Sequence, residues 1–224
     1  MQSNKTRKIA FLIILCITGA FLNVALHLLT TGENLLPLYL DTVFTITVTL
    51  LIGPVWGCIT GALTNIISHT NNFWGWEGYL FALCNIATAV ITWLFIRLFP
   101  QELRLTPEQY NLKPAHLAKS RQLDKIMNRI IILTLLSFAL CLTISILGGI
   151  ISVFIEILRG NETALNPASP PNAHYSEFPL VLREIISRIP INIIDRILSA
   201  FGGFGIALIF IYLRKRLFSY CINN

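Results

Sequence analysis

The feature that most constrains this chain is a series of long stretches without a charged residue. The longest, Thr42–Trp76, has 35 residues, and four more cover Ile9–Gly32, Gly78–Ile96, Ile130–Ile155 and Ile197–Leu213. A helix that spans the hydrocarbon core of a bilayer needs about 20 mostly apolar residues. Only 12% of the residues are charged, whereas soluble domains carry about 25%. The sequence therefore predicts a multi-pass, all-α integral membrane protein and excludes a soluble enzyme, a secreted disulfide scaffold and a disordered chain.

The 35-residue stretch contains a helix break. One helix of that length would measure about 52 Å, whereas the hydrocarbon core is about 30 Å thick. At Gly53-Pro54 the proline cannot continue the preceding helix, so we expect a tight hairpin. The chain then forms a single membrane domain, residues 1–224, with a compact bundle of six transmembrane helices. Their expected ranges are 9–29, 38–52, 55–69, 79–99, 127–158 and 190–213.

The segment before the last predicted span is more polar than the spans. Pro179–Ile189 contains Arg183, Glu184 and Arg188, which is too much charge for a segment exposed to lipid. We expect it to be a short amphipathic element at the membrane surface, separate from the helix that begins at Pro190.

The basic residues predict the orientation of the bundle. Lys and Arg concentrate in cytoplasmic loops. With six spans, both termini lie on one side, and that side holds 13 of the 17 Lys and Arg residues, seven of them between Arg97 and Arg129. We expect cytoplasmic termini, a cytoplasmic loop at 100–126, an outer loop at 159–189 and localisation in the cell membrane. This topology explains the net charge of +6 without a nucleic-acid partner.

Polar residues recur on one face of most predicted helices. Residues three or four apart share a helix face, and the third span carries Gly57, Gly61, Asn65 and His69 at this spacing. In the expected orientation, small residues gather in the cytoplasmic half and polar residues in the outer half. Small residues allow close helix packing, whereas ionisable residues in a membrane face the bundle interior or a wet cavity. We therefore expect an outward-open polar cup.

The candidate substrate-binding residues are the polar and aromatic side chains expected around this cup. They are Asp41, Asn65, His69, Trp74, Trp76, Asn85, Glu156, Arg188, Asn192, Asp195 and Arg196. Structural roles remain open for the same residues: interhelical hydrogen bonds for the asparagines, positions at the membrane interface for the rings, and an ion pair for Asp195 and Arg196. The mixture of acids, arginines and aromatic rings favours a zwitterionic or heteroaromatic solute.

No catalytic motif accompanies these residues. The chain contains no nucleophile elbow, His-Glu-x-x-His pair, P-loop or dinucleotide fingerprint, and its five cysteines lack metal-ligand spacing. We predict neither an enzyme nor a cofactor or metal site. Because the chain has no ATPase motif, uphill transport takes its energy from a partner or an ion.

Two stretches resemble the substrate-binding S components of energy-coupling factor (ECF) transporters. The hairpin Leu40–Asn65, with LDTVFT and GPVWG, is similar to the second and third helices of these proteins, and Ile189–Ser199, IPINIIDRILS, to the start of their last helix. The resemblance implies a vitamin- or micronutrient-binding membrane subunit that works with a membrane T component and a pair of cytoplasmic ATPases. It also implies a T-component docking face on the first helix, where the small-residue pattern falls on Cys16, Gly19 and Ala20.

The alternative is a non-transport membrane scaffold of similar six-helix architecture, of the rod-shape-determining type. Such a protein binds other membrane proteins and no small solute. It has no need of ionisable residues in the outer half of its helices, whereas this chain has several there.

Overall fold

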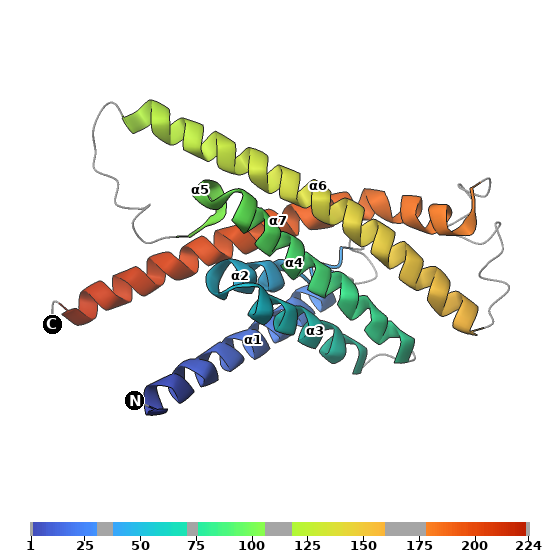
Figure 1. Ribbon diagram of the computed structural model, residues 1–224, viewed down its shortest axis with the longest axis horizontal. Coiled ribbons are helices and arrows are strands. Elements are labelled where there is room, and N and C mark those ends of the chain that lie inside the picture. The colour runs from blue at the N-terminus through green and yellow to red at the C-terminus, as the bar shows by residue number, and fades with distance from the viewer. Residues whose placement is uncertain (1, 31–37, 71–75, 106–117, 160–177, 223–224) are drawn as a thin grey trace.

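The computed structural model describes residues 2–30, 38–70, 76–105, 118–159 and 178–222, and within these ranges the chain forms helices and no strand (Figure 1). The elements are α1 (Gln2–Thr30), α2 (Val43–Ile52), α3 (Pro54–Thr70), the 3-10 helix η1 (Trp76–Phe81), α4 (Ala82–Leu98), α5 (Pro100–Leu103), α6 (Ala118–Arg159) and α7 (Leu180–Ile222). Four helical stretches are long and apolar enough to cross a membrane: Ile9–Thr30, Gly78–Leu98, Leu123–Leu158 and Leu180–Leu213. The prediction of an all-α protein with the features of a membrane protein is confirmed.

The predicted hairpin lies between α2 and α3. Helix α2 ends at Ile52, and Gly53 follows with φ of +106° while its N–H donates to the carbonyl of Thr49. Only glycine adopts such a φ without strain. Pro54 is the first residue of α3, a position where its fixed φ suits a helix and its missing N–H has no helical partner to lose. With 10 and 17 residues, α2 and α3 are shorter than the four membrane-length stretches, which have 21 to 36 residues, and the count of six spans stays a prediction.

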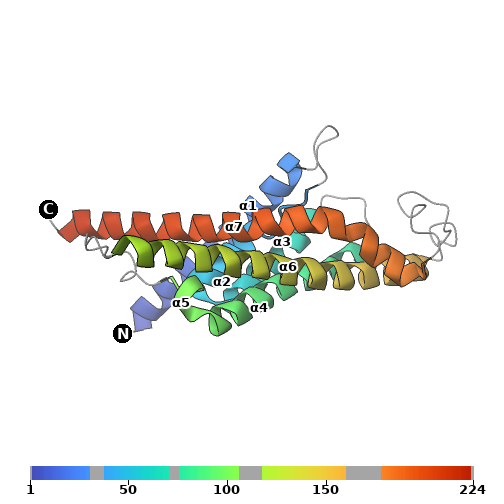
Figure 2. The same ribbon diagram turned by 90° about the horizontal axis from the view of Figure 1, so that it is seen from above.

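Helices α6 and α7 form the most extensive helix pair, and α1 crosses α2 and α3 at an angle (Figures 1 and 2). Glycines allow the closest approaches. A Cβ atom at Gly203 of α7 would lie 2.7 Å from the carbonyl oxygen of Val43, and one at Gly61 of α3 would lie 2.9 Å from that of Asn85. Small residues thus bring backbones together, as is typical of helix packing in lipid.

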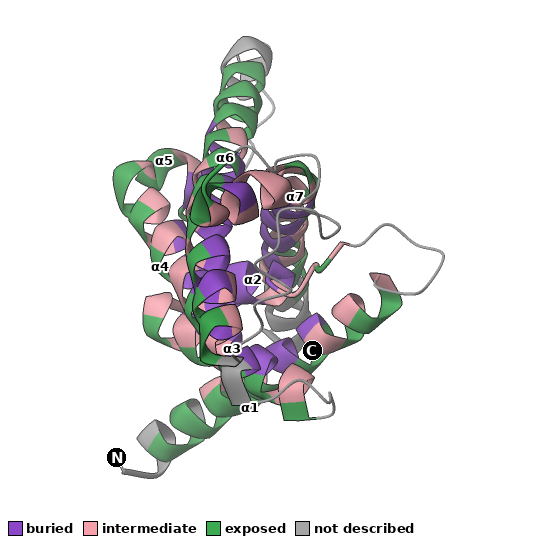
Figure 3. Ribbon diagram, turned by 90° about the vertical axis from the view of Figure 1, so that its right-hand side faces the viewer, coloured by how far each residue is buried: buried purple, intermediate pink, exposed green. Residues whose placement is uncertain are grey.

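Figure 3 shows buried residues where the helices face one another and exposed residues on their outer faces. Many outward side chains are large and apolar, and the buried set includes polar as well as apolar residues. Large apolar side chains such as Leu29, Val55 and Tyr212 are at least 65% exposed, whereas Asn23, Thr45 and other polar side chains are fully buried. Extended exposed apolar surface marks contact with a membrane or another protein. The exposed apolar side chains of the long helices fit contact with lipid.

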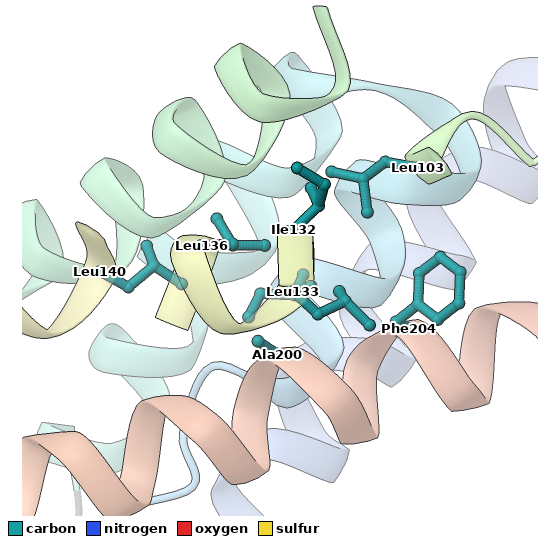
Figure 4. Close-up of a cluster of buried hydrophobic side chains, with 8 residues drawn as sticks. Leu103, Ile132, Leu133, Leu136, Leu140, Ala200 and Phe204 are labelled. Atoms are coloured by element: carbon teal, nitrogen blue, oxygen red, sulfur yellow. The ribbon is translucent and has the colours of Figure 1, made fainter. Parts of the chain in front are cut away.

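A cluster of buried apolar side chains occupies the end of the bundle near the two termini (Figures 1 and 4). Leu103 of the short helix α5 belongs to this cluster, together with Leu136 and Leu140 of α6 and Phe204 of α7. Arg129 of α6 holds α5 in place, because its Nε donates to the carbonyl of Glu102 at 3.0 Å.

Helix α7 corrects the prediction for the segment 179–189. The helix begins at Leu180 and continues through Pro190, so residues 180–189 belong to α7 and not to an independent surface element or loop. Proline removes one backbone hydrogen bond and bends a helix without having to end it, and α7 bends along its length (Figure 2). The charges of the segment turn inward: Arg183 is buried, while Val181 and Leu182 are exposed.

Three other boundaries also differ from the expected ones. Helix α1 begins at Gln2, and α5 and the start of α6 lie within the predicted loop 100–126. With 42 residues, α6 measures about 63 Å at 1.5 Å per residue, roughly twice the thickness of a hydrocarbon core. The length of an apolar stretch predicts which part of a helix contacts lipid. It does not predict how far the helix extends past the membrane.

Candidate functional site: a polar cavity

A cavity of about 340 Å³ lies between the helices at the end of the bundle opposite the termini. Its volume falls at the lower end of the range for small-molecule sites, about 300–1,000 Å³. Seven segments contribute to its wall: α1, the residues before α2, α3, η1, α4, α6 and α7. The lining residues are His27, Tyr39, Asp41, Asn65, Ser68, His69, Gly78, Phe81, Cys84, Asn85, Ile144, Gly148, Ser152, Ile155, Glu156, Arg188, Asn192 and Arg196.

The structure brings eight of the eleven predicted site residues together around this cavity. These are Asp41, Asn65, His69, Asn85, Glu156, Arg188, Asn192 and Arg196. Asp195 does not line the cavity. Trp74 lies outside the described residues, and Trp76 is the first residue of η1 with a side chain outside the description.

One stripe of α6 forms a wall of the cavity. Ile144, Gly148, Ser152 and Glu156 line it at intervals of four residues, which places them on one helix face. Their neighbour Ser145 is instead buried and accepts a hydrogen bond from Asn192 Nδ2 at 2.8 Å. Next to the face of α6 that lines the cavity, α6 and α7 are thus joined by a polar contact.

Helix α7 provides the facing wall through Arg188, Asn192 and Arg196, again four residues apart. Arg188 Nη2 donates to Ser152 Oγ and lies 3.8 Å from Glu184 Oε2. The guanidinium carbon also lies 5.9 Å from the centre of the Phe81 ring, within the distance of a cation–π contact.

A network of ion pairs forms the floor of the cavity. Arg196 Nη2 lies 2.5 Å from Asp195 Oδ2 and 3.6 Å from Asp41 Oδ1, and Nη1 donates to Thr42 Oγ1 at 2.6 Å. Asp41 Oδ2 accepts a hydrogen bond from Asn85 Nδ2 at 3.1 Å. One arginine thus serves two carboxylates, and the network joins the start of α2 to α4 and α7.

Asp195 takes the structural role that the sequence left open. Its side chain is fully buried, pairs with Arg196, and accepts a hydrogen bond from the backbone N–H of Leu40 at 2.7 Å. The carboxylate fixes the segment before α2 against α7, and Asp195 is not among the residues that line the cavity. The geometry therefore corresponds to the ion-pair alternative.

Aromatic and imidazole rings surround another part of the cavity. His27 of α1 stacks on Tyr39, with ring centres 5.7 Å apart and planes at 8°. His69 contacts Tyr79, and a Cβ atom at Gly78 would lie 2.1 Å from the His69 ring, so glycine is required for this approach. The rings supply apolar faces beside the charged floor.

The burial of α1 corrects the predicted docking face. Cys16 and Ala20 are at most 1% exposed, and a Cβ atom at Gly19 would meet Thr60 of α3 at 3.2 Å and Val48 of α2 at 3.4 Å. All three residues pack α1 against its own bundle. A partner cannot contact side chains that neighbouring helices already cover.

Sequence reasoning missed several lining residues. Tyr39, Ser68, Phe81 and Gly148 were not among the predicted site residues, and Phe81 precedes the helix on which Asn85 was recognised. Gly148 could have been predicted from the sequence. It lies four residues before Ser152, which lies four before Glu156, so all three share one helix face. No comparable pattern marks Tyr39 or Phe81.

Comparisons with protein-family models, with curated proteins and with solved structures found no match to this chain. The likeness of Leu40–Asn65 and Ile189–Ser199 to ECF S components stays a prediction from the sequence. Any function assigned to the cavity must follow from its geometry and chemistry.

Proposed function

We propose that this protein is the membrane-embedded, substrate-binding subunit of an ECF-type importer, which captures a vitamin or a similar micronutrient from outside the cell. The observation that carries the proposal is the cavity of about 340 Å³, lined by charged, amide and aromatic side chains within an otherwise apolar bundle. Small-molecule sites combine an apolar wall with a few convergent polar groups in this way.

The polar lining favours a solute site over a purely structural role. Ionisable residues in a membrane are costly, and they face the bundle interior or a water-filled path where they serve a function. Asp41, Glu156, Arg188 and Arg196 all line one cavity. A scaffold needs interhelical hydrogen bonds but no hollow among them.

Filling the cavity tests the proposal. Gly148 lines it, and a Cβ atom there would lie 3.6 Å from Arg188 Nη1, 3.9 Å from Arg188 Cδ and 4.0 Å from Cys84 Sγ. These are side-chain atoms at ordinary contact distances, so Gly148→Leu adds bulk without a backbone clash. The matched control is Gly205→Leu on α7, where a Cβ atom meets nothing within 4 Å. Native mass spectrometry and thermal shift with a panel of vitamins should show solute binding by the wild type and the control, and none by Gly148→Leu. Equal binding by all three proteins, or by none, contradicts the proposal.

Co-purification distinguishes the transporter subunit from the scaffold. A mild-detergent pull-down of the tagged chain should bring a T component and two ATPases. Recovery of membrane proteins of cell-wall synthesis, with no ATPase and no bound solute, would favour the scaffold.

The proposed role also needs the cavity to face outward. In a variant without native cysteines, Phe178→Cys at the start of α7 should react with a membrane-impermeant maleimide on intact cells. Lys125→Cys, which is exposed near the start of α6, should react only after the cells are opened. The reverse pattern would place the cavity on the cytoplasmic side and contradict import from outside.

A further inference from the structure

The charges around the cavity do not balance. Arg196 is shared by Asp195 and Asp41, and Arg188 lies near Glu184 of its own helix. Arg183, also on α7, is buried away from the cavity lining and has contacts of its own. Every arginine near the cavity is therefore engaged.

Glu156 has no cation among the residues that the structure describes. Its carboxylate lines the cavity, and Oε2 is buried without a hydrogen-bond partner. Arg188 is held by Ser152, one turn before Glu156, and by Glu184, and it forms no ion pair with Glu156 in this part of the chain. Glu156 as a whole is half-buried, but a carboxylate oxygen that is buried without a partner is costly, so a cation that enters the cavity gains a ready counter-charge.

We infer that the cavity binds a small organic cation, with a protonated nitrogen that donates to Glu156. The inference rests on the proposed function, because it takes the cavity as the solute site, and it specifies the class of solute. Arg188 Nε is also buried without a hydrogen-bond partner, so a solute with an acceptor atom a few ångströms from its cationic nitrogen satisfies both groups. The Phe81 and Tyr39 rings suit an aromatic or methylated cation, since ring faces attract positive charge.

Three probes of similar shape and different charge test the inference: benzylamine, benzyl alcohol and benzoate. Their affinities for the purified protein in lipid nanodiscs are measured by ligand-observed NMR. Benzylamine should bind tightest and benzoate weakest. In Glu156→Gln the affinity for benzylamine should fall about tenfold or more, the effect of losing a hydrogen bond to a charged group, while that for benzyl alcohol stays the same.

The control is Glu102→Gln, a carboxylate of α5 at the other end of the bundle, which should bind all three probes as the wild type does. Melting temperatures of both variants establish that they are folded. Tighter binding of benzoate, equal binding of the three probes, no binding of benzylamine, or a benzylamine affinity that Glu156→Gln leaves unchanged overturns the inference.

Failure of the proposed function has a different signature. If Gly148→Leu retains vitamin binding, or no ATPase co-purifies, the chain is not an importer subunit that uses this cavity. Benzylamine binding that depends on Glu156 would still show a cation site there. If Gly148→Leu blocks vitamin binding and Glu156→Gln leaves it unchanged, the proposal of an importer subunit stands. The inference that the cavity binds an organic cation at Glu156 is then wrong.

Discussion

The two ends of the bundle hold their helices together by different means. At the end near the termini, Leu103, Leu136 and Phe204 pack into a dry apolar cluster. At the opposite end, Arg196, Asp195 and Asp41 join the helices through charges around a cavity. The same helices α6 and α7 contribute to both ends.

The difference shows where each kind of contact is useful in lipid. Apolar side chains gain little from leaving a hydrocarbon solvent, so association relies on close packing and on polar contacts. Close packing of apolar side chains leaves no space between helices, and it is found at the end without the cavity. Ion pairs between long side chains hold two helices together while their backbones stay apart. Such contacts leave room for a cavity, and they are found at the end that has one.

The largest effect should come from removing the arginine at the polar end. Arg196→Met leaves Asp195 and Asp41 without their shared cation, and loss of one partner from a buried ion pair costs about 3–5 kcal/mol. Arg129→Met at the apolar end removes one hydrogen bond, to the Glu102 carbonyl, and the contact with Phe204, with an expected cost of about 1 kcal/mol. Thermal unfolding in detergent, followed by size-exclusion chromatography, measures both variants. Equal losses would show that the two ends depend on charge to the same extent.

The next prediction separates stability from binding. Asp195→Asn keeps an acceptor for Leu40 N–H but weakens the contact with Arg196, so the protein should lose about 1.5–3 kcal/mol. Solute affinity should stay close to that of the wild type, because Asp195 does not line the cavity. Glu156→Gln should behave in the opposite way, with a melting temperature at or above that of the wild type and weaker binding of benzylamine. If the Asp195→Asn protein has normal stability and binds solute weakly, Asp195 contacts the solute and its structural role is wrong.

Asp195 also shows how far the sequence could predict the site. Hydrophobicity and the Gly53-Pro54 break were sufficient to locate the long apolar helices and the hairpin, since these depend on local chemistry, although the helix ends differ from the predicted ones. The facing polar stripes were sufficient for eight cavity residues. Asp195 and Arg196 are adjacent in the sequence, and the choice of which one faces the cavity depends on helix rotation: Arg196 is four residues from Asn192, and Asp195 is three.

Long-range packing explains the remaining errors. Small residues at Cys16 and Ala20 predict a close helix contact, but the sequence does not say whether the contact is within the chain or with a partner. Pro190 either ends or bends a helix, depending on whether the preceding segment packs against the bundle. Here Ile185, before the proline, lies against Gly149 of α6, and that contact keeps the segment helical and docked.

A smaller effect should distinguish two glycines of α7. A Cβ atom at Gly203 would meet the Val43 carbonyl oxygen at 2.7 Å, whereas one at Gly205 meets nothing. Gly203→Ala should destabilise the protein by about 1–3 kcal/mol through overpacking, and Gly205→Ala should be neutral or stabilise the helix by up to about 1 kcal/mol. Melting temperatures measure both. Equal effects would mean that α7 and α2 separate easily and that this contact is not tightly packed.

The smallest effect concerns a single hydrogen bond between α1 and α3. Asn23 Nδ2 donates to Thr64 Oγ1 at 3.0 Å, and the Thr64 hydroxyl donates in turn to the carbonyl of Thr60, four residues earlier. Thr64→Val removes both bonds and keeps the side-chain shape. Thr134→Val on the exposed face of α6 removes only the equivalent bond to the carbonyl of Ile130, so the difference between the variants isolates the interhelical bond. We expect about 0.6 kcal/mol, the mean for such bonds in a membrane protein, because the separated helices also find partners. A difference above about 2 kcal/mol would show that the α1–α3 contact depends on its buried amide as strongly as the cavity floor depends on its arginine.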